Sequence, residues 1–161
     1  MASFVQPRVT RNQVTKAGTR IAAGKATIAD NLALENWRAS HAWVINTFQM
    51  NLRRRARGTD VIVGTRLKRR TTIINKLRRF PNMQLGRMHD IAGCRVIFPD
   101  LQSLRTFRQG VHNARFAHTR RSAEEDRWNY VDHPKPDGYR GVHDVLNMRV
   151  EQTLVVPGRD Y

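Results

Sequence analysis

Large apolar and ring-bearing side chains recur at helical spacing over residues 26–57. They follow one another at intervals of three and four, which places them along one face of a helix: Leu34, Trp37, His41, Val44, Phe48 and Leu52. The run is long enough for two helices, or for one helix that bends near Asn46. Residues 1–25 mix Pro, Gly, Thr and basic residues without a clear period, so we expect a loose segment there.

The pattern then alternates between strands and helices. Residues 60–68 are rich in Val, Ile and Thr, which predicts a strand. Thr71 or Thr72 can cap a short helix that runs to Arg79, because Pro81 follows directly. A second strand is expected over residues 93–98. Pro99 and Asp100 then open a helix whose apolar residues again repeat at three and four: Leu101, Leu104, Phe107 and Val111.

The last part of the chain predicts a loop and a strand. Residues 118–138 are polar and contain two prolines, which indicates a long loop. A strand is expected over 142–155, with Leu146, Met148 and Val150 on one face. Turn residues at 157–160 predict a hairpin partner, but the chain ends at Tyr161. We therefore expect one incomplete domain over residues 26–161: a helical lead-in at 26–57 and a core at 60–161.

This order of elements predicts an α/β (α+β) fold, with helices around a small sheet. The 161 residues, 40% of them hydrophobic, suffice for one domain with its own core. The single Cys94 excludes an internal disulfide and a zinc site made of cysteines. No apolar run reaches the length of a signal peptide or a membrane span, so the expected location is the cytosol, away from membranes.

Charge points to the class of partner. There are 29 Lys+Arg against 13 Asp+Glu, and the formal net charge is +16. This balance predicts polyanionic partners, such as nucleotides, RNA, DNA or an acidic membrane surface. Basic residues are densest between Arg53 and Arg79. Any one of them could lie on a solvated face, but the cluster as a whole favours contact with phosphates.

A first candidate site combines four residues near the end of the first predicted strand. Arg66 and Lys68 are two apart and project from the same face of a strand. Thr72 and Lys76 lie one turn apart near the start of the next helix, where the helix dipole favours anions. This arrangement is a plausible cradle for a triphosphate. The alternative is a basic surface with no ligand.

A second candidate is Asp90, which directly precedes the second predicted strand. Mg²⁺ keeps several waters and shares its remaining positions with phosphates, so one carboxylate beside a cationic pocket can serve as its protein ligand. A helix cap or an ion pair with Arg95 would explain the same residue.

A third candidate is the loop that leads into the last predicted strand. It presents Lys135, Tyr139 and His143 among turn residues. A tyrosine can stack on a base, a lysine can bind phosphate, and a histidine can donate a hydrogen bond to phosphate oxygens. Alternatively, Tyr139 covers a core and His143 is a structural histidine.

Taken in order, the three motifs resemble a known family. R-x-K-x3-T-x3-K, then D-I-x-G-x-R, then P-K-x-x-G-Y-R-G-x-H resemble the synthetase domain of RelA/SpoT proteins, in particular small stand-alone members. The upstream E-N-W-R-A-S-H and N-T-F-Q segments are similar to the helical lead-in of such proteins. The resemblance extends from about Leu34 to Val150.

This resemblance implies a nucleotidyltransferase-like fold and a pyrophosphokinase of the GTP diphosphokinase type. Such an enzyme moves the β,γ-pyrophosphate of ATP to the 3′-hydroxyl of GDP or GTP and makes the alarmone (p)ppGpp in the bacterial stringent response. The cofactor implied is Mg²⁺, bound by Asp90. By position, the residues implied to bind ATP are Arg66 at the adenine and, at the phosphates, Lys68, Thr72 and Lys76. Those implied to bind the acceptor guanosine are Lys135, Tyr139 and His143, and those implied to be catalytic are Asp90, Lys76 and His143.

Two features differ from the family pattern and keep alternatives open. Thr72 and Gly141 stand where relatives commonly have Ser. Family members also continue into a strand with an E-x-Q-x-R motif, for which Glu151 is a poor substitute because it precedes the turn. One alternative is therefore a nucleotide- or RNA-binding remnant without activity. Another is a toxin-like relative that pyrophosphorylates the 3′ end of tRNA. An oligomer is compatible with each of these.

Overall fold

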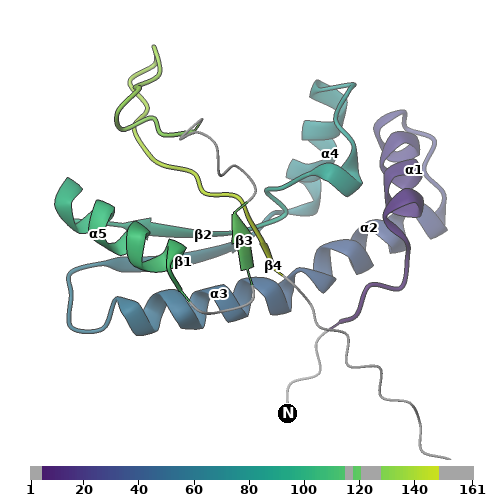
Figure 1. Cartoon of the computed structure of the whole chain (residues 1–161). Coiled ribbons are helices and arrows are strands. Elements are labelled where there is room, and N and C mark those ends of the chain that lie inside the picture. Colours follow the sequence, from purple (N-terminus) through teal and green to yellow (C-terminus); the bar gives the residue numbers. More distant parts are fainter. Residues whose placement is uncertain (1–4, 115–117, 121–127, 149–161) are drawn as a thin grey trace, which may run out of the picture. The chain divides into compact units, whose positions relative to one another are not determined.

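The computed structural model describes residues 5–114, 118–120 and 128–148. The chain forms an α+β fold, as predicted, in which helices accompany small antiparallel sheets (Figure 1). It divides into two compact units, Met1–Val111 and His112–Tyr161, and each is described by itself. In the order of the chain the elements are α1 (Arg11–Ala22), α2 (Ile28–Ser40), α3 (Ala42–Arg55), β1 (Ile62–Leu67), α4 (Arg70–Arg79), the 3-10 helix η1 (Leu85–Arg87), β2 (Ala92–Ile97), α5 (Leu101–His112), β3 (His118–Arg120) and β4 (Leu146–Met148).

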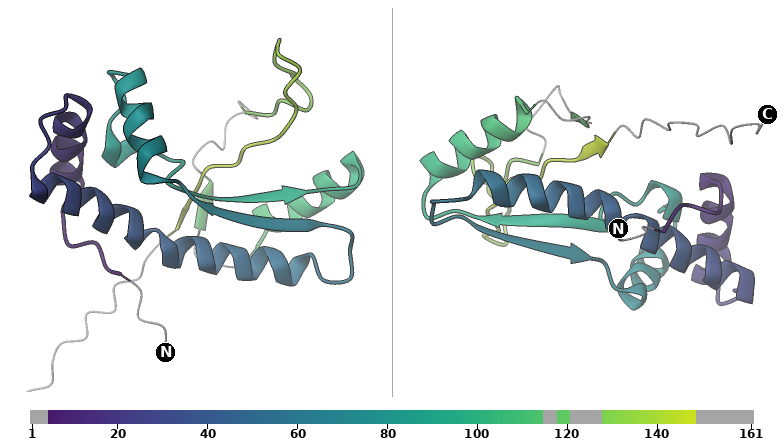
Figure 2. Two further views of the ribbon diagram at one scale, coloured as in Figure 1. Left: turned by 180° about the vertical axis from the view of Figure 1, so that it is seen from behind. Right: turned by 90° about the horizontal axis from the view of Figure 1, so that it is seen from below.

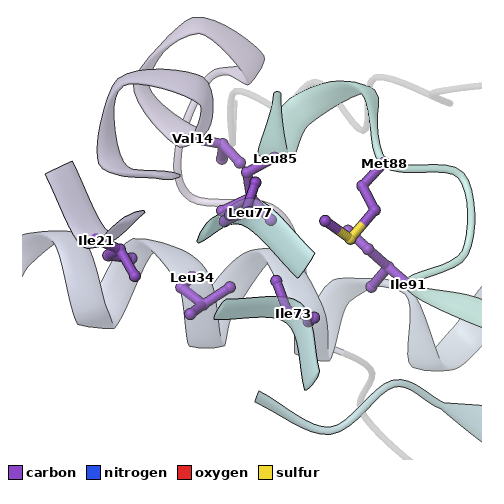
Figure 3. Packing of buried hydrophobic residues seen from close by; sticks show 8 residues of the cluster. All are labelled: Val14, Ile21, Leu34, Ile73, Leu77, Leu85, Met88 and Ile91. Carbon is purple, nitrogen blue, oxygen red and sulfur yellow. The ribbon is translucent and has the colours of Figure 1, made fainter. Parts of the chain in front are cut away.

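The main core of the first unit lies between α1, α2, α4 and η1 (Figure 3). Its buried members are Val14, Ile21, Leu34, Ile73, Leu77, Leu85, Met88 and Ile91. Leu85 is fully buried, and a Cβ atom added at Gly18 would lie only 2.6 Å from its Cβ. The glycine therefore lets α1 approach η1 closely. Burying one such leucine contributes about 2 kcal/mol to folding.

Residues 11–22 form helix α1, so the expectation of a loose N-terminal segment is wrong there. A capping box starts the helix: the Thr10 side chain accepts a hydrogen bond from the Gln13 N–H, and the Gln13 side chain accepts one from the Thr10 N–H. The buried face consists of Val14, Ala17, Gly18 and Ile21. Two of these four residues, Ala17 and Gly18, are small and allow close packing. The helix therefore lacks the repeat of large apolar residues by which a buried helix face is recognised in a sequence.

The predicted helical lead-in is two helices, and the chain breaks at His41 rather than near Asn46. The carbonyl oxygen of Trp37 lies 2.8 Å from the Ser40 Oγ and 2.6 Å from the His41 Nδ1. Both side chains are close to an acceptor of the helical ladder, and the His41 N–H bonds to the Arg38 carbonyl at 3.2 Å. These contacts replace the regular helical hydrogen bonds at the end of α2, which stops at Ser40. Helix α3 continues along the sheet of β1 and β2 (Figures 1 and 2).

Strands β1 and β2 pair antiparallel and confirm the two strands predicted before residue 100. Along β2 the exposure alternates: Ala92, Cys94 and Val96 are partly buried, whereas the residues between them are exposed. One face of the sheet is therefore covered and the other is open. Burial also raises the pKa of the Cys94 thiol.

The helices that flank β2 were predicted correctly, except for one cap. Helix α4 begins at Arg70 with Arg69 at the N-cap and no side-chain capping bond, so neither Thr71 nor Thr72 caps it. Helix α5 follows Asp100, whose carboxylate accepts hydrogen bonds from the N–H and the hydroxyl of Ser103, both at 2.7 Å.

In the second unit, β3 pairs antiparallel with β4, so residues 118–120 form a strand and not the start of the predicted loop. Three residues are too few to produce a period in the sequence. The strand predicted over 142–155 appears as β4 and as a single bridge between Asn129 and Val142. Residues 149–161 lie outside the described residues, and with them Val150, Glu151 and the predicted turn. Within the described ranges, no helix is both long and apolar enough to cross a membrane.

Asp30 ties α1 to α2 and makes the stability of the fold sensitive to acid. Its side chain is nearly fully buried, and its carboxylate accepts hydrogen bonds from Arg20 and from the N–H and hydroxyl of Thr27. The Arg20 hydrogen bond, followed by those of Thr27, holds the pKa of Asp30 far below its usual range.

We therefore expect the free energy of unfolding to fall as the pH drops below about 4, the usual pKa of an unfolded aspartate. Asp30 stays ionised to a lower pH in the folded state than in the unfolded state. The stabilisation that its ion pair and hydrogen bonds provide is therefore complete above about pH 4 and is lost progressively below it. Thermal unfolding from neutral pH into the acid range should show a shallower acid decline for Asp30→Asn, which is also less stable at neutral pH. The control is Asp60→Asn at an exposed position, for which the decline should stay unchanged. An equally steep decline in Asp30→Asn would contradict the assignment.

Candidate active site

Two lysines and one carboxylate meet at the end of the β1–β2 sheet. The Nζ atoms of Lys68 and Lys76 lie 2.7 Å and 2.8 Å from Oδ2 of Asp90. Lys68 directly follows β1, Lys76 lies on α4, and Asp90 precedes β2. Two of the predicted phosphate ligands thus lie together with the predicted metal ligand. In the described part of the chain Asp90 neither caps a helix nor pairs with Arg95, so these two alternatives are wrong.

The backbone explains why these groups meet. The Lys68 N–H donates to the Ile91 carbonyl at 2.7 Å and so extends the β1–β2 ladder by one residue. Lys68 therefore lies opposite the residue that follows Asp90. Ile91 is fully buried in the core and Ile73 of α4 packs in the same cluster. The core consequently holds strand, turn and helix in one arrangement.

The electrostatics of this cluster keep Asp90 ionised. Partial burial acts to raise the pKa of Asp90, but hydrogen bonds and charges from Lys68 and Lys76 outweigh it, and the net pKa is lowered. The Asp90 side chain is 48% exposed, whereas that of Lys68 is 12% exposed. Only Oδ2 meets the lysines; Oδ1 has no hydrogen-bond partner among the described residues. An open, negatively charged oxygen remains beside two cations.

The other two predicted ATP ligands lie nearby in the sequence but not in the ion cluster. Thr72 is in the first turn of α4 and is partly buried. Arg66 lies on the open face of the sheet and is opposite Gly93. Arg95, the arginine of the D-I-x-G-x-R motif, to which no binding role was assigned from the sequence, lies on the same open face opposite Gly64.

The glycines leave the space beside both arginines free. A Cβ atom added at Gly93 would meet no described atom within 4 Å, and one added at Gly64 would meet only the Arg95 carbonyl oxygen, at 3.9 Å. Two guanidinium groups on adjacent strands therefore border an uncovered patch of sheet. Guanidinium planes stack on aromatic rings, so this face suits a planar base. The arginines belong to two different sequence motifs, and the strand register shows that they lie on the same face of the sheet.

In the second unit, the third candidate group forms a cluster of rings. The hydroxyl of Tyr139 and Nε2 of His143 are 2.9 Å apart, and the two rings are stacked with centroids 5.8 Å apart. The Nζ atom of Lys135 lies 5.4 Å from the centroid of the Tyr139 ring. Tyr139 is 40% exposed, so it does not act as a core lid. All three residues predicted to bind the acceptor thus come together.

A fourth residue, Tyr130, was missed by the sequence analysis. Lys135 Nζ lies 4.3 Å from the centroid of the Tyr130 ring, and this ring makes T-shaped contacts with the rings of Tyr139 and His143. The Tyr130 N–H donates to the Gly141 carbonyl at 2.9 Å, next to the Asn129–Val142 bridge. This pairing across the loop brings Tyr130 to the cluster.

Two glycines shape the turn that carries Tyr139. Gly138 has a φ of +79°, a conformation that favours glycine, and its N–H donates to the Lys135 carbonyl at 2.9 Å. A Cβ atom added at Gly141 would lie 2.9 Å from the hydroxyl oxygen of Tyr139. Glycine at 141 therefore lets this hydroxyl approach the backbone and reach His143. A serine there would compete for the same space.

The chemistry of Asp90 fits the magnesium ion that the resemblance implies. The described residues contain no group of three His, Cys, Asp or Glu side chains that could enclose a metal ion. Mg²⁺ needs no such cage where substrate phosphates and waters supply most of its ligands. The open Oδ1 atom of Asp90 is a suitable single protein ligand for Mg²⁺. The ammonium groups of Lys68 and Lys76 lie beside it and can bind phosphate oxygens.

Comparison with protein families decides the relationship. Residues 65–156, more than half of the chain, match the region found in RelA / SpoT proteins. The chain belongs to the RelA/SpoT family. The matched region spans every predicted site residue from Arg66 to His143, whereas α1, α2 and α3 precede it. No curated protein matches the chain.

Membership of the RelA/SpoT family carries general consequences. Its synthetase domains are pyrophosphokinases that use ATP and GDP or GTP, and they generally depend on Mg²⁺. The Lys68–Lys76–Asp90 cluster and the ring cluster have the chemistry for a triphosphate and for a base, respectively.

Proposed function

We propose that this chain transfers the β,γ-pyrophosphate of ATP to the 3′-hydroxyl of GDP or GTP and so makes (p)ppGpp. The observation that carries the proposal is the convergence of Lys68 and Lys76 on Asp90. The family match supports the reaction class. The activity belongs in the cytosol, where these nucleotides occur.

On the ATP side, Lys68 and Lys76 bind oxygens of the triphosphate and Asp90 holds Mg²⁺. Bound there, the ion neutralises charge on the phosphates. Thr72, in the first turn of α4, offers a hydroxyl to the same phosphates. Because this kind of transfer needs little covalent chemistry from the protein, alignment and charge neutralisation provide most of the rate acceleration. Arg66 stacks on the adenine, and Arg95 on the same open face contributes a second guanidinium.

On the acceptor side, Tyr139 stacks on the guanine. Lys135 and His143 contact the phosphates of GDP or GTP, and Tyr130 supports the rings of Tyr139 and His143 through T-shaped contacts. In the reaction, the acceptor 3′-oxygen forms a bond to the β-phosphorus of ATP. The bond between this phosphorus and the α,β-bridging oxygen breaks, AMP leaves with the electron pair, and the 3′-hydroxyl passes its proton to a solvent water molecule.

A transfer assay tests this proposal. The 161-residue chain is incubated with γ-labelled ATP, Mg²⁺ and GDP or GTP, with Asp90→Ala as the control. We expect label on the guanosine nucleotide, and none in the control. ATP binding without transfer to any acceptor would favour the inactive, nucleotide-binding remnant, and absence of ATP binding would refute the proposal.

The net charge of +16 favours a second acceptor, the 3′ end of tRNA. Arg53 and Arg54 in the last turn of α3 and Arg57 just beyond the helix are exposed and would suit a polynucleotide backbone. Bulk tRNA in the same assay separates the two acceptors. Label on tRNA but not on GDP or GTP would select it. Binding to tRNA should then weaken steeply as the salt concentration rises, whereas binding to GDP should change little.

A further inference from the structure

The segment that joins β1 to α4 is braced by helix α2, which lies outside the part of the chain matched to the family. The Arg38 Nε–H donates to the carbonyl oxygen of Lys68 at 2.7 Å. Arg38 belongs to the last turn of α2 and its side chain is 27% exposed. A charged donor therefore holds the main chain of a residue that meets Asp90.

The same face of α2 also holds Arg70, the first residue of α4. The Glu35 carboxylate lies 3.3 Å from Nε of Arg70, and the Asn31 side-chain oxygen accepts a hydrogen bond from Arg70 at 2.6 Å. The other carboxylate oxygen of Glu35 lies 3.7 Å from Arg38. Asn31, Glu35 and Arg38 are spaced by four and three, as residues on one helical face are.

These contacts complete the support of the Lys68 backbone. Its N–H is fixed by the Ile91 carbonyl at 2.7 Å and its carbonyl by Arg38. Lys68 Nζ is the end of a long, flexible side chain, so its place beside Asp90 depends on where the main chain is held. A ligand group must stay within a fraction of an ångström of its working position, and its supporting residues are what keep it there.

We propose that α2 is part of the ATP site and that Arg38 is its positioning residue, with Glu35 and Asn31 bracing Arg70 beside it. This inference rests on the proposed function, because it assigns the braced segment to the binding of ATP phosphates. Arg38 itself touches no substrate. It acts by keeping Lys68 in register with Asp90 and α4.

The test compares Arg38→Ala with Arg20→Ala in the full chain. Arg20 is a matched control: it pairs with the buried Asp30 and its loss destabilises the same unit, but it does not contact residues 68–70. Two quantities are measured, the affinity for a non-hydrolysable ATP analogue with Mg²⁺ and the hydrogen–deuterium exchange of the segment from β1 to α4.

In Arg38→Ala we expect faster exchange in residues 66–72 and a Kd for the ATP analogue raised roughly 10- to 100-fold, the usual range for a residue that supports a ligand-binding group. The affinity for GDP should stay the same, and Arg38→Lys should restore part of the ATP affinity. Arg20→Ala should lower the thermal unfolding midpoint and leave the Kd for the analogue unchanged.

Unchanged exchange in Arg38→Ala overturns the inference, and so does faster exchange with an unaltered Kd. An equal loss of affinity in Arg20→Ala also overturns it, because the effect would then be one of general stability. Failure of the unsubstituted chain to bind the ATP analogue counts against the proposed function instead, and exchange still reports whether Arg38 holds the segment.

Discussion

Asp90→Asn is expected to lower the rate of pyrophosphate transfer by about 100-fold or more, while the chain remains folded. The amide keeps the size of the side chain but removes the charge that holds Mg²⁺ and draws the lysines together. Losing such an electrostatic contribution at a phosphoryl-transfer site typically costs two to three orders of magnitude. Because Asp90 is 48% exposed, its loss should affect stability only modestly.

The same variant separates loss of charge from loss of structure. Without Mg²⁺, ATP should bind to Asp90→Asn at least as tightly as to the unsubstituted chain, because a carboxylate no longer competes with the phosphates for Lys68 and Lys76. Calorimetry with ATP in the presence of a chelator measures this. Asp60→Asn serves as the control at an exposed position. Transfer within a few-fold of the unsubstituted chain would remove Asp90 from the proposed site.

Tyr139→Ala is expected to raise the KM for the guanosine acceptor roughly 10- to 100-fold and to leave the affinity for ATP unchanged. Stacking of a base on an aromatic side chain contributes about 1–3 kcal/mol. Tyr139 is exposed and its ring is supported by Tyr130 and His143, so a base can stack against it without displacing core residues. Steady-state kinetics with each substrate varied in turn gives the two constants.

Tyr139→Phe is the matched control for this prediction. Phenylalanine keeps the ring but loses the hydroxyl that lies 2.9 Å from Nε2 of His143. Its KM for the acceptor should therefore rise only a few-fold. If Tyr139→Ala weakened ATP and acceptor binding equally, the ring would be acting on the fold rather than on the guanine.

The elements of the first unit were largely predictable because their patterns are strong. β1 is a short run rich in β-branched residues, α5 shows apolar residues at helical spacing, and Pro81 marks the end of α4. Helix α1 was not predictable in this way, since its buried face uses Ala17 and Gly18 to approach Leu85 closely. The break at His41 depends on the side chains of Ser40 and His41, which both contact the Trp37 carbonyl group. The spacing of apolar residues gives no sign of such contacts.

The residues of the candidate site were likewise predictable from the sequence only in part. Spacing along a strand and a helix predicted that Lys68 and Lys76 lie together, and the position of Asp90 directly before a strand made it the candidate metal ligand beside them. Arg95 belongs to the D-I-x-G-x-R motif, but its place on the same face as Arg66 follows only from the pairing of β1 with β2. Tyr130 lies in no motif and is brought to the ring cluster by the backbone pairing next to the Asn129–Val142 bridge. Arg38 acts through a backbone carbonyl, and no motif records such a contact.

The most direct test of the account is the identity of the products formed from ATP. The 161-residue chain is incubated with Mg²⁺, GDP or GTP, and ATP labelled in the β-position or the γ-position, and the nucleotides are then separated. We predict one AMP for each acceptor modified, with both labels found on the same guanosine product. ADP with only the γ-label transferred, or free phosphate with no modified acceptor, would contradict pyrophosphate transfer by this chain.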